Sequence, residues 1–259
     1  MNTTPFGYLA LVLHAHLPYV RHPEYKDSLE EHWLFEAITE TYIPLLQVYT
    51  NLIKENIDFR ITMSLTPTLI SMLRDPLLQE RYVKHLNKMI ELAEKEIIRT
   101  KFEPAANAVA KMYRGKLVDA AGIFDYMFQR DIVKGFKDIQ DAGKLEIITC
   151  GATHGFFPLD PSGISVNAQV KTAVDHYYRV FEKRPKGIWL PECGYRPGDD
   201  EILKRHGIEF FFTDTHGILY GKPRPNYGVF APVYCPSGVA AFGRDLESSK
   251  QVWSAKEGY

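Results

Sequence analysis

Four short polar clusters in the sequence contain side chains that could carry chemistry. They are His14-Ala15-His16, Thr153-His154, Glu192-Cys193 and Asp214-Thr215-His216. Each cluster follows an apolar run typical of a buried strand, and the carboxyl ends of parallel strands meet at one edge of a sheet. We therefore expect the four clusters to converge on one active site, although about 200 residues separate the first from the last.

The stretch GIWLPECGY, residues 187–195, contains the most informative of these clusters. Ile188, Trp189 and Leu190 suit a buried strand, and Glu192 follows them almost at once. A single glutamate in such a place is often only a residue that has reached water at the end of a strand. Its coincidence with three other polar clusters at strand ends favours a catalytic role for Glu192.

Two chemistries fit these residues. In the first, His14 and His16 point to the same side of a strand, since they are two residues apart. Together with His154, Asp214 or His216 they would form an open three-ligand zinc site of a metal-dependent hydrolase or deacetylase.

The second chemistry is glycoside transfer. Glu192 would attack the anomeric carbon of a sugar while a second carboxyl group, about 5–5.5 Å away in a retaining enzyme, protonates the leaving oxygen. The histidines would then hydrogen-bond the sugar hydroxyls and keep the nucleophile ionised. The residues alone leave both chemistries open.

The elements that must position these clusters alternate along the chain. We expect helices at about 30–55 and 166–182, a short helix at 198–205, and a long helical stretch that begins at Asp75-Pro76 and stops near Gly143. Five strands are expected beside these helices, in the segments 7–20, 59–65, 144–155, 187–193 and 208–217. This alternation predicts an α/β fold with a mostly parallel sheet covered by helices.

The helical stretch at about 75–143 lies between two strands and is expected to be an insertion after the second strand. Beyond Asp214 the sequence is rich in Gly, Pro and Tyr and shows no obvious closing helix. Five strands are too few for a closed β/α barrel, which usually has about eight. The sequence therefore predicts an incomplete β/α barrel.

Composition excludes several functional classes. The 259 residues include 31 basic and 32 acidic side chains. A net charge of −1 lacks the excess of positive charge that is typical of proteins that bind nucleic acid or an anionic membrane. The apolar run from Tyr8 to Leu13 is too short for a signal peptide or a membrane span. Three scattered cysteines, Cys150, Cys193 and Cys235, argue for a reducing compartment. We expect a cytoplasmic protein.

Five segments carry a resemblance to a known family. They are HAHLPYVRHPE (14–24), GATHGFFPL (151–159), WLPECGYRPG (189–198), FFTDTHG (211–217) and FGRDLESSKQVWSAKEGY (242–259). Each is several residues long, and their order along the chain matches that of glycoside hydrolase family 57. The chain resembles most the 1,4-α-glucan branching enzymes of that family. The resemblance implies a barrel of the seven-stranded type found in glycoside hydrolases and deacetylases.

The resemblance also implies a mechanism and a substrate. It implies a retaining reaction on α-1,4-glucan, such as amylose or a glycogen-like polymer, with no metal or other cofactor. Glu192 falls on the family's nucleophile, and His14, His16 and His154 fall on histidines that line the site of the cleaved sugar. We expect further substrate contacts from Trp189, Cys193, Asp214 and His216. An α-amylase, a 4-α-glucanotransferase or a glucan-binding module without turnover are the alternatives, beside the metal hydrolase.

One part of the family pattern has no match here. The acid/base aspartate of the family belongs to a fourth motif, which is expected beyond Tyr259 and is followed by a helical domain. Residues 1–259 are therefore expected to be the N-terminal part of the catalytic domain, without the C-terminal helical domain, and to be inactive on their own.

Overall fold

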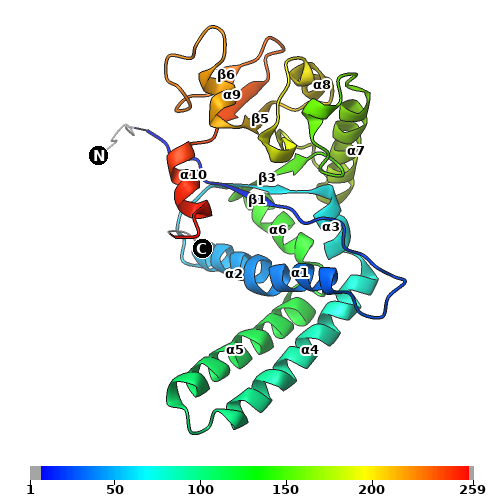
Figure 1. The fold of residues 1–259 in the computed structure, drawn as a ribbon, viewed down its shortest axis with the longest axis vertical. Helices are drawn as coiled ribbons and strands as arrows, with labels where there is room; N and C mark the ends of the chain where they lie inside the picture. Colours follow the sequence, from blue (N-terminus) through cyan, green and yellow to red (C-terminus); the bar gives the residue numbers. More distant parts are fainter. Residues whose placement is uncertain (1–6, 257–259) are drawn as a thin grey trace. The chain divides into compact units, whose positions relative to one another are not determined.

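The computed structural model describes residues 7–256, which divide into two compact units (Figure 1). The first, here called the sheet unit, takes in the described residues up to His16, Ile61–Pro67, and those from Glu146 onward. The second, the helical unit, takes in Leu17–Arg60 and Thr68–Leu145. All the residues singled out for chemistry belong to the sheet unit.

The sheet unit is built on seven strands, which run in the order β1-β2-β3-β4-β5-β7-β6. Strands β1 and β2 pair in parallel, as do β3, β4, β5 and β7, whereas β6 pairs with β7 antiparallel. Their bounds are Val12–Ala15 (β1), Ile61–Leu65 (β2), Leu145–Cys150 (β3), Gly187–Trp189 (β4), Phe210–Thr213 (β5), Val233–Tyr234 (β6) and Ala240–Gly243 (β7). The predicted α/β class, the mostly parallel sheet and the five expected strands are confirmed.

The region after Asp214 is more regular than its sequence suggests. It forms β6, β7 and a helix, α10 (Leu246–Trp253), so the expectation of no closing helix was wrong. Ala240, Ala241 and Gly243 have weak strand preferences, and parallel pairing with β5 outweighs them. The start of α10 is capped by Asp245, whose Oδ2 accepts a hydrogen bond from the Ser248 amide at 3.0 Å.

Three further helices belong to the sheet unit, namely α7 (Ile164–Phe181), α8 (Asp199–Arg205) and α9 (Thr215–Leu219). One face of α7 buries Val166, Val170 and Val174 in the same apolar cluster as Ile188 of β4 and Phe211 of β5. This spacing of three to four residues is that of an amphipathic helix, as the sequence predicts. The core therefore fixes β4 directly before the turn that carries Glu192.

The helical unit contains the long helices expected from the sequence. In the segments expected to be helical lie α1 (Leu29–Ala37), α2 (Ile43–Lys54), α4 (Pro76–Arg99), α5 (Pro104–Gly122) and α6 (Ile132–Asp141). A further short helix, α3 (Pro67–Leu73), was not expected from the sequence. The predicted cap at Asp75 is confirmed, since its Oδ1 accepts from the Leu77 and Leu78 amides at 2.9 and 3.1 Å. Gly143, with φ of 71°, follows the end of α6 as expected.

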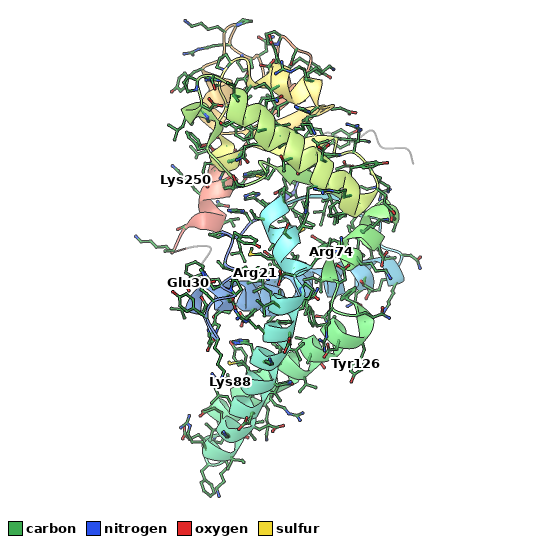
Figure 2. All side chains as sticks on the ribbon, turned by 90° about the vertical axis from the view of Figure 1, so that its right-hand side faces the viewer. Arg21, Glu30, Arg74, Lys88, Tyr126 and Lys250 are labelled. Carbon is green, nitrogen blue, oxygen red and sulfur yellow. The ribbon has the colours of Figure 1, made fainter. Side chains whose placement is uncertain are left out.

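Helices α4 and α5 lie side by side as a hairpin within the helical unit (Figure 1). Figure 2 labels two of the unit's outward-facing side chains, Lys88 on α4 and Tyr126 in the π-helical segment Ile123–Met127 that follows α5. None of the helices in residues 7–256 has the length and apolar character needed to cross a membrane.

Gly187 at the start of β4 offers a test of this packing. A Cβ at this position would lie 2.3 Å from two ring atoms of Phe210 and 2.8 Å from the Cγ2 atom of Ile148. Gly187→Ala should therefore lower the free energy of unfolding by about 1–3 kcal/mol, because the neighbouring strands would have to move apart. Urea denaturation measures this loss.

Gly115→Ala is the matched control, since a Cβ on this glycine of α5 would meet nothing within 4 Å. Alanine is the better helix former, so the control should keep or slightly raise stability. Equal stability of Gly187→Ala and the wild type would contradict the packing described for β4.

Candidate active site

Two histidines lie at the carboxyl end of β1 and are held by hydroxyl groups at the end of β2. His14 stands opposite Ser64 in the strand register, and its Nδ1 lies 2.6 Å from the Ser64 Oγ. Nδ1 of His16 lies 3.3 Å from the Thr66 Oγ1. The two imidazole centroids are 6.0 Å apart with nearly parallel planes. Both rings therefore face the same side, as their two-residue spacing predicts.

His154 and Trp189 complete a group of four rings, here called the ring stack. His154 follows β3, and its ring lies 3.7 Å from that of His16 and 5.4 Å from that of His14. Trp189, the last residue of β4, stacks on His14 with centroids 4.5 Å apart. Residues from three separate strands thus meet at one edge of the sheet.

Glu192 lies beside the ring stack, in the turn that follows β4. Two backbone hydrogen bonds close this turn, from the Cys193 amide to the Leu190 carbonyl at 2.8 Å and from Gly194 to Pro191 at 3.1 Å. The Glu192 side chain is 78% exposed, and its Oε1 lies 3.5 Å from Nε2 of His154. A carboxylate in this place is open to a ligand on one side and steadied by an imidazole on the other.

The backbone is strained at three of these positions. His154, Glu192 and Cys193 have φ angles of 59°, 53° and 54°, in the left-handed region that favours glycine. Such conformations cost about 1–3 kcal/mol each and cluster at functional sites. The surroundings that maintain them include the Thr213 hydroxyl, which donates to the Cys193 carbonyl at 3.1 Å.

The ring stack favours neutral imidazoles. Burial, followed by the nearby His154, lowers the pKa of His16 from 6.5 to about 4. The same two causes lower the pKa of His14, although the residue as a whole is exposed. Burial also lowers the pKa of His154, and Glu192 opposes this shift. A neutral imidazole has one donor and one acceptor nitrogen, which suits sugar hydroxyl groups.

A second polar group lies at the ends of β5 and β7. Arg244, directly after β7, has its Nη1 3.3 Å from Oδ1 of Asp214 and 3.7 Å from the Cys193 sulfur. The Thr215 hydroxyl donates to the Arg244 carbonyl at 2.7 Å. Asp214 and Cys193 are thus joined through an arginine, whereas His216 is exposed on the first turn of α9 and is not one of the four stacked rings.

Sequence reasoning missed several residues that contact the predicted ones. They include Ser64, Thr66, Cys150 and Arg244. Ser64 and Thr66 close the second strand as polar residues after apolar ones, a signal like that of the four clusters. Arg244 stands within the segment 242–259 that carries the family resemblance. Cys150 ends an apolar strand, and nothing in the sequence distinguishes it from an ordinary core residue.

The geometry does not favour the zinc site considered from the sequence. Among residues 7–256, no group of three or more His, Cys, Asp or Glu side chains is placed to hold a metal ion. The rings of His14, His16 and His154 are stacked with interplanar angles of 15–24°. Imidazole lone pairs lie in the ring plane, so nearly parallel rings do not point at a common tetrahedral centre.

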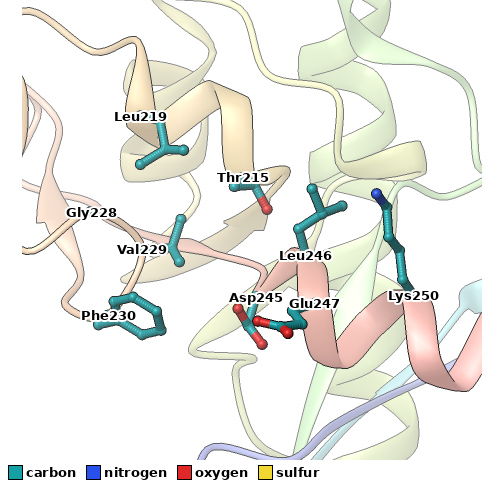
Figure 3. Close-up of a pocket in the computed structure, with 9 residues that line it drawn as sticks. All are labelled: Thr215, Leu219, Gly228, Val229, Phe230, Asp245, Leu246, Glu247 and Lys250. Carbon is teal, nitrogen blue, oxygen red and sulfur yellow. The ribbon is translucent and has the colours of Figure 1, made fainter.

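An open pocket of about 360 Å³ lies in the same unit (Figure 3). Thr215 and Asp245 line it, and they directly follow Asp214 and Arg244 in the chain. Figure 3 shows Leu219, Val229 and Phe230 contributed by α9 and the segment after it, and the start of α10 on the other side. Its described lining residues include none of the ring stack, so the pocket is distinct from the position of Glu192.

Comparison with known proteins assigns the family. The model of glycosyl hydrolase family 57 matches residues 10–252. The 1,4-alpha-glucan branching enzyme TK1436 of Thermococcus kodakarensis is 34% identical over 98% of this chain, which spans 41% of that protein. This chain thus covers less than half the length of that relative.

Solved structures agree in fold. The crystal structure of the alpha-amylase AmyC from Thermotoga maritima is 50% identical over 98% of this chain, with a TM-score of 0.92. That of a family 57 branching enzyme from Pyrococcus horikoshii is 33% identical over 95%, with a TM-score of 0.88. This chain covers 48% of each crystallised chain. On the family match and on these relatives, the chain belongs to glycosyl hydrolase family 57.

Proposed function

We propose that this chain supplies the nucleophile and the sugar-binding histidines of a retaining enzyme acting on α-1,4-glucan. The observation that carries the proposal is the position of Glu192. Its carboxylate is exposed at the end of β4 and lies 3.5 Å from Nε2 of His154. An attacking carboxylate has to reach a sugar while keeping its charge, and this arrangement provides both access and a hydrogen-bond donor.

In the proposed reaction, an oxygen of Glu192 attacks the anomeric carbon and the glycosidic bond breaks. His14, His16 and His154 bind hydroxyl groups of the cleaved sugar as neutral donors and acceptors. Protonation of the leaving oxygen requires a second carboxyl group. We do not assign that role to Asp214, because its carboxylate pairs with Arg244 at 3.3 Å. The acid/base is proposed to be the aspartate of the family's fourth motif.

The finer activity we propose is 1,4-α-glucan branching. A 6-hydroxyl group of a glucan would displace Glu192 from the glycosyl intermediate and leave an α-1,6 branch. The branching-enzyme relatives support this choice, whereas the 50% identity to a protein described as an alpha-amylase favours hydrolysis as the second candidate. The choice between them depends on how well the complete site binds an acceptor and excludes water.

Product analysis separates the two candidates. A protein that carries this chain together with the family's fourth motif is incubated with amylose, the product is debranched, and the chain lengths are measured. Branching predicts new α-1,6 linkages with little rise in reducing ends. Hydrolysis predicts shorter linear chains and a rise in reducing ends, and this outcome would assign the amylase activity instead.

Glu192→Gln should abolish covalent chemistry while leaving glucan binding nearly unchanged. The amide has almost the shape of the carboxylate but cannot attack the anomeric carbon, so the rate should fall by more than about 10³-fold. Intact mass spectrometry of the chain with a glucosyl fluoride donor measures formation of the glycosyl-enzyme, and calorimetry with maltooligosaccharide measures binding. A labelling rate within about tenfold of the wild type would remove Glu192 from the nucleophile role.

His16→Ala should change the pH dependence of stability as well as sugar chemistry. The pKa of His16 is about 4 in the folded chain and 6.5 as the ordinary value. Between these values the unfolded chain binds more protons, so the wild type should lose stability as the pH falls from about 6.5 to about 4. His16→Ala should lose less over that window, and should also react more slowly with the fluoride donor.

Chemical denaturation at a series of pH values measures this effect. His216→Ala is the control for the stability profile, because the exposed His216 is outside the ring stack. It should keep the wild-type profile. If His16→Ala lowers stability at all pH values without slowing the reaction, His16 is a structural residue and not a sugar ligand.

A further inference from the structure

Three side chains form a line that ends at the proposed nucleophile. The Cys150 sulfur lies 3.1 Å from Nδ1 of His154, and Nε2 of the same imidazole lies 3.5 Å from Oε1 of Glu192. The imidazole therefore has one neighbour at each nitrogen. Its tautomer is set by which of these neighbours accepts a hydrogen and which donates one.

The hydrogen-bonding capacity of the three groups indicates which of them donates and which accepts at each contact. An ionised carboxylate only accepts hydrogen bonds, so a hydrogen bond between His154 and Glu192 requires the hydrogen on Nε2, the nitrogen that faces the carboxylate. Nδ1 of a neutral His154 is then an acceptor, and the thiol of Cys150 is the donor beside it. Cys150 is fully buried, and burial raises the pKa of its thiol, so its hydrogen is retained at neutral pH.

We propose that Cys150 is a positioning residue whose thiol holds His154 in the tautomer that donates from Nε2 to Glu192. The inference rests on the proposed role of Glu192 as the nucleophile. The opposite tautomer would direct a lone pair of Nε2 at the carboxylate and a hydrogen at the sulfur. Cys150 therefore influences the reaction through the orientation and charge of Glu192, without touching the sugar.

The backbone around Cys150 and His154 supports this role. Cys150 is the last residue of β3 and pairs in register with Trp189 of β4, so its side chain is fixed by the sheet. The His154 amide donates to the Gly151 carbonyl at 3.0 Å, and His154 adopts a φ of 59°. This tight turn places the imidazole of His154 beside the sulfur of Cys150. Strained backbone conformations cluster at functional sites, so this turn supports a functional role for the contact between the thiol and the imidazole nitrogen.

The tautomer can be read directly. Long-range proton–nitrogen correlation spectra of the full 259-residue chain distinguish histidines protonated at Nε2 from those protonated at Nδ1, and His154→Gln identifies the His154 signals. The wild type should show the hydrogen on Nε2. Cys150→Ser keeps a donor and should preserve this pattern, whereas Cys150→Ala should give a mixture of the two tautomers.

The second readout is the rate at which a glucosyl fluoride donor labels Glu192. In this step a Glu192 oxygen forms a bond to the anomeric carbon, the carbon–fluorine bond breaks, and fluoride leaves. Loss of a well-directed hydrogen bond to a charged group should slow labelling by roughly tenfold to a hundredfold in Cys150→Ala. Cys150→Ser should restore a rate near that of the wild type. Cys235→Ala, a half-buried thiol away from this line, is the matched control and should label normally.

Several outcomes would overturn the proposal. One is a wild-type His154 protonated at Nδ1, a result that needs no variant and therefore holds even if Cys150→Ala fails to fold. Another is a folded Cys150→Ala that labels at the wild-type rate. Cys150→Ser as slow as Cys150→Ala would also overturn it, since packing and not hydrogen donation would then be responsible.

The failure of the proposed function gives a different pattern. If Glu192→Gln is still labelled, Glu192 is not the nucleophile, whatever the tautomer of His154. If Glu192→Gln is unlabelled and Cys150→Ala is unaffected, only the role of Cys150 is lost.

Discussion

Parallel pairing between neighbouring strands holds the candidate site together, because each of its side chains lies on or just after the carboxyl end of a strand. The register that places His14 opposite Ser64 also sets the hydrogen bond between their side chains. The register that pairs Cys150 with Trp189 brings the turns after β3 and β4 together. A slip of one residue in either pair would turn the side chains to the opposite face of the sheet. The strand register therefore fixes the positions of the site's side chains as well as the pairing of the sheet.

A second feature of the site is the partial removal of water from its three histidines. Packing the rings of His14, His16 and His154 against one another removes part of their water and makes a positive charge on any of them unfavourable. The edge of the sheet thus offers neutral hydrogen-bonding groups beside one exposed carboxylate. This combination suits a ligand rich in hydroxyl groups, and the positive charge nearby is carried by Arg244, which is already paired with Asp214.

Much of this arrangement could be predicted from sequence because buried parallel strands leave a strong signal. The apolar run before Glu192 fixes the strand and its end, and the same holds for the segments before His14 and His154. The strand at Ala240–Gly243 escaped prediction, because its small residues have little preference of their own and depend on pairing with β5. Arg244 was missed with it. The Cys150–His154 contact depends on a left-handed turn at His154, which no local pattern of residue types encodes.

The ring contact between His14 and Trp189 joins residues 175 positions apart in the chain, since they are numbered 14 and 189. Such a contact closes a very long loop, and proteins dominated by distant pairings fold slowly. During synthesis, β1 leaves the ribosome well before β4 exists, and Arg244 follows later still. Until then the first strands present apolar faces and unpaired edges, which makes an early intermediate vulnerable to association with other chains. The order of the strands along the chain therefore places a kinetic demand on the cell that produces this protein.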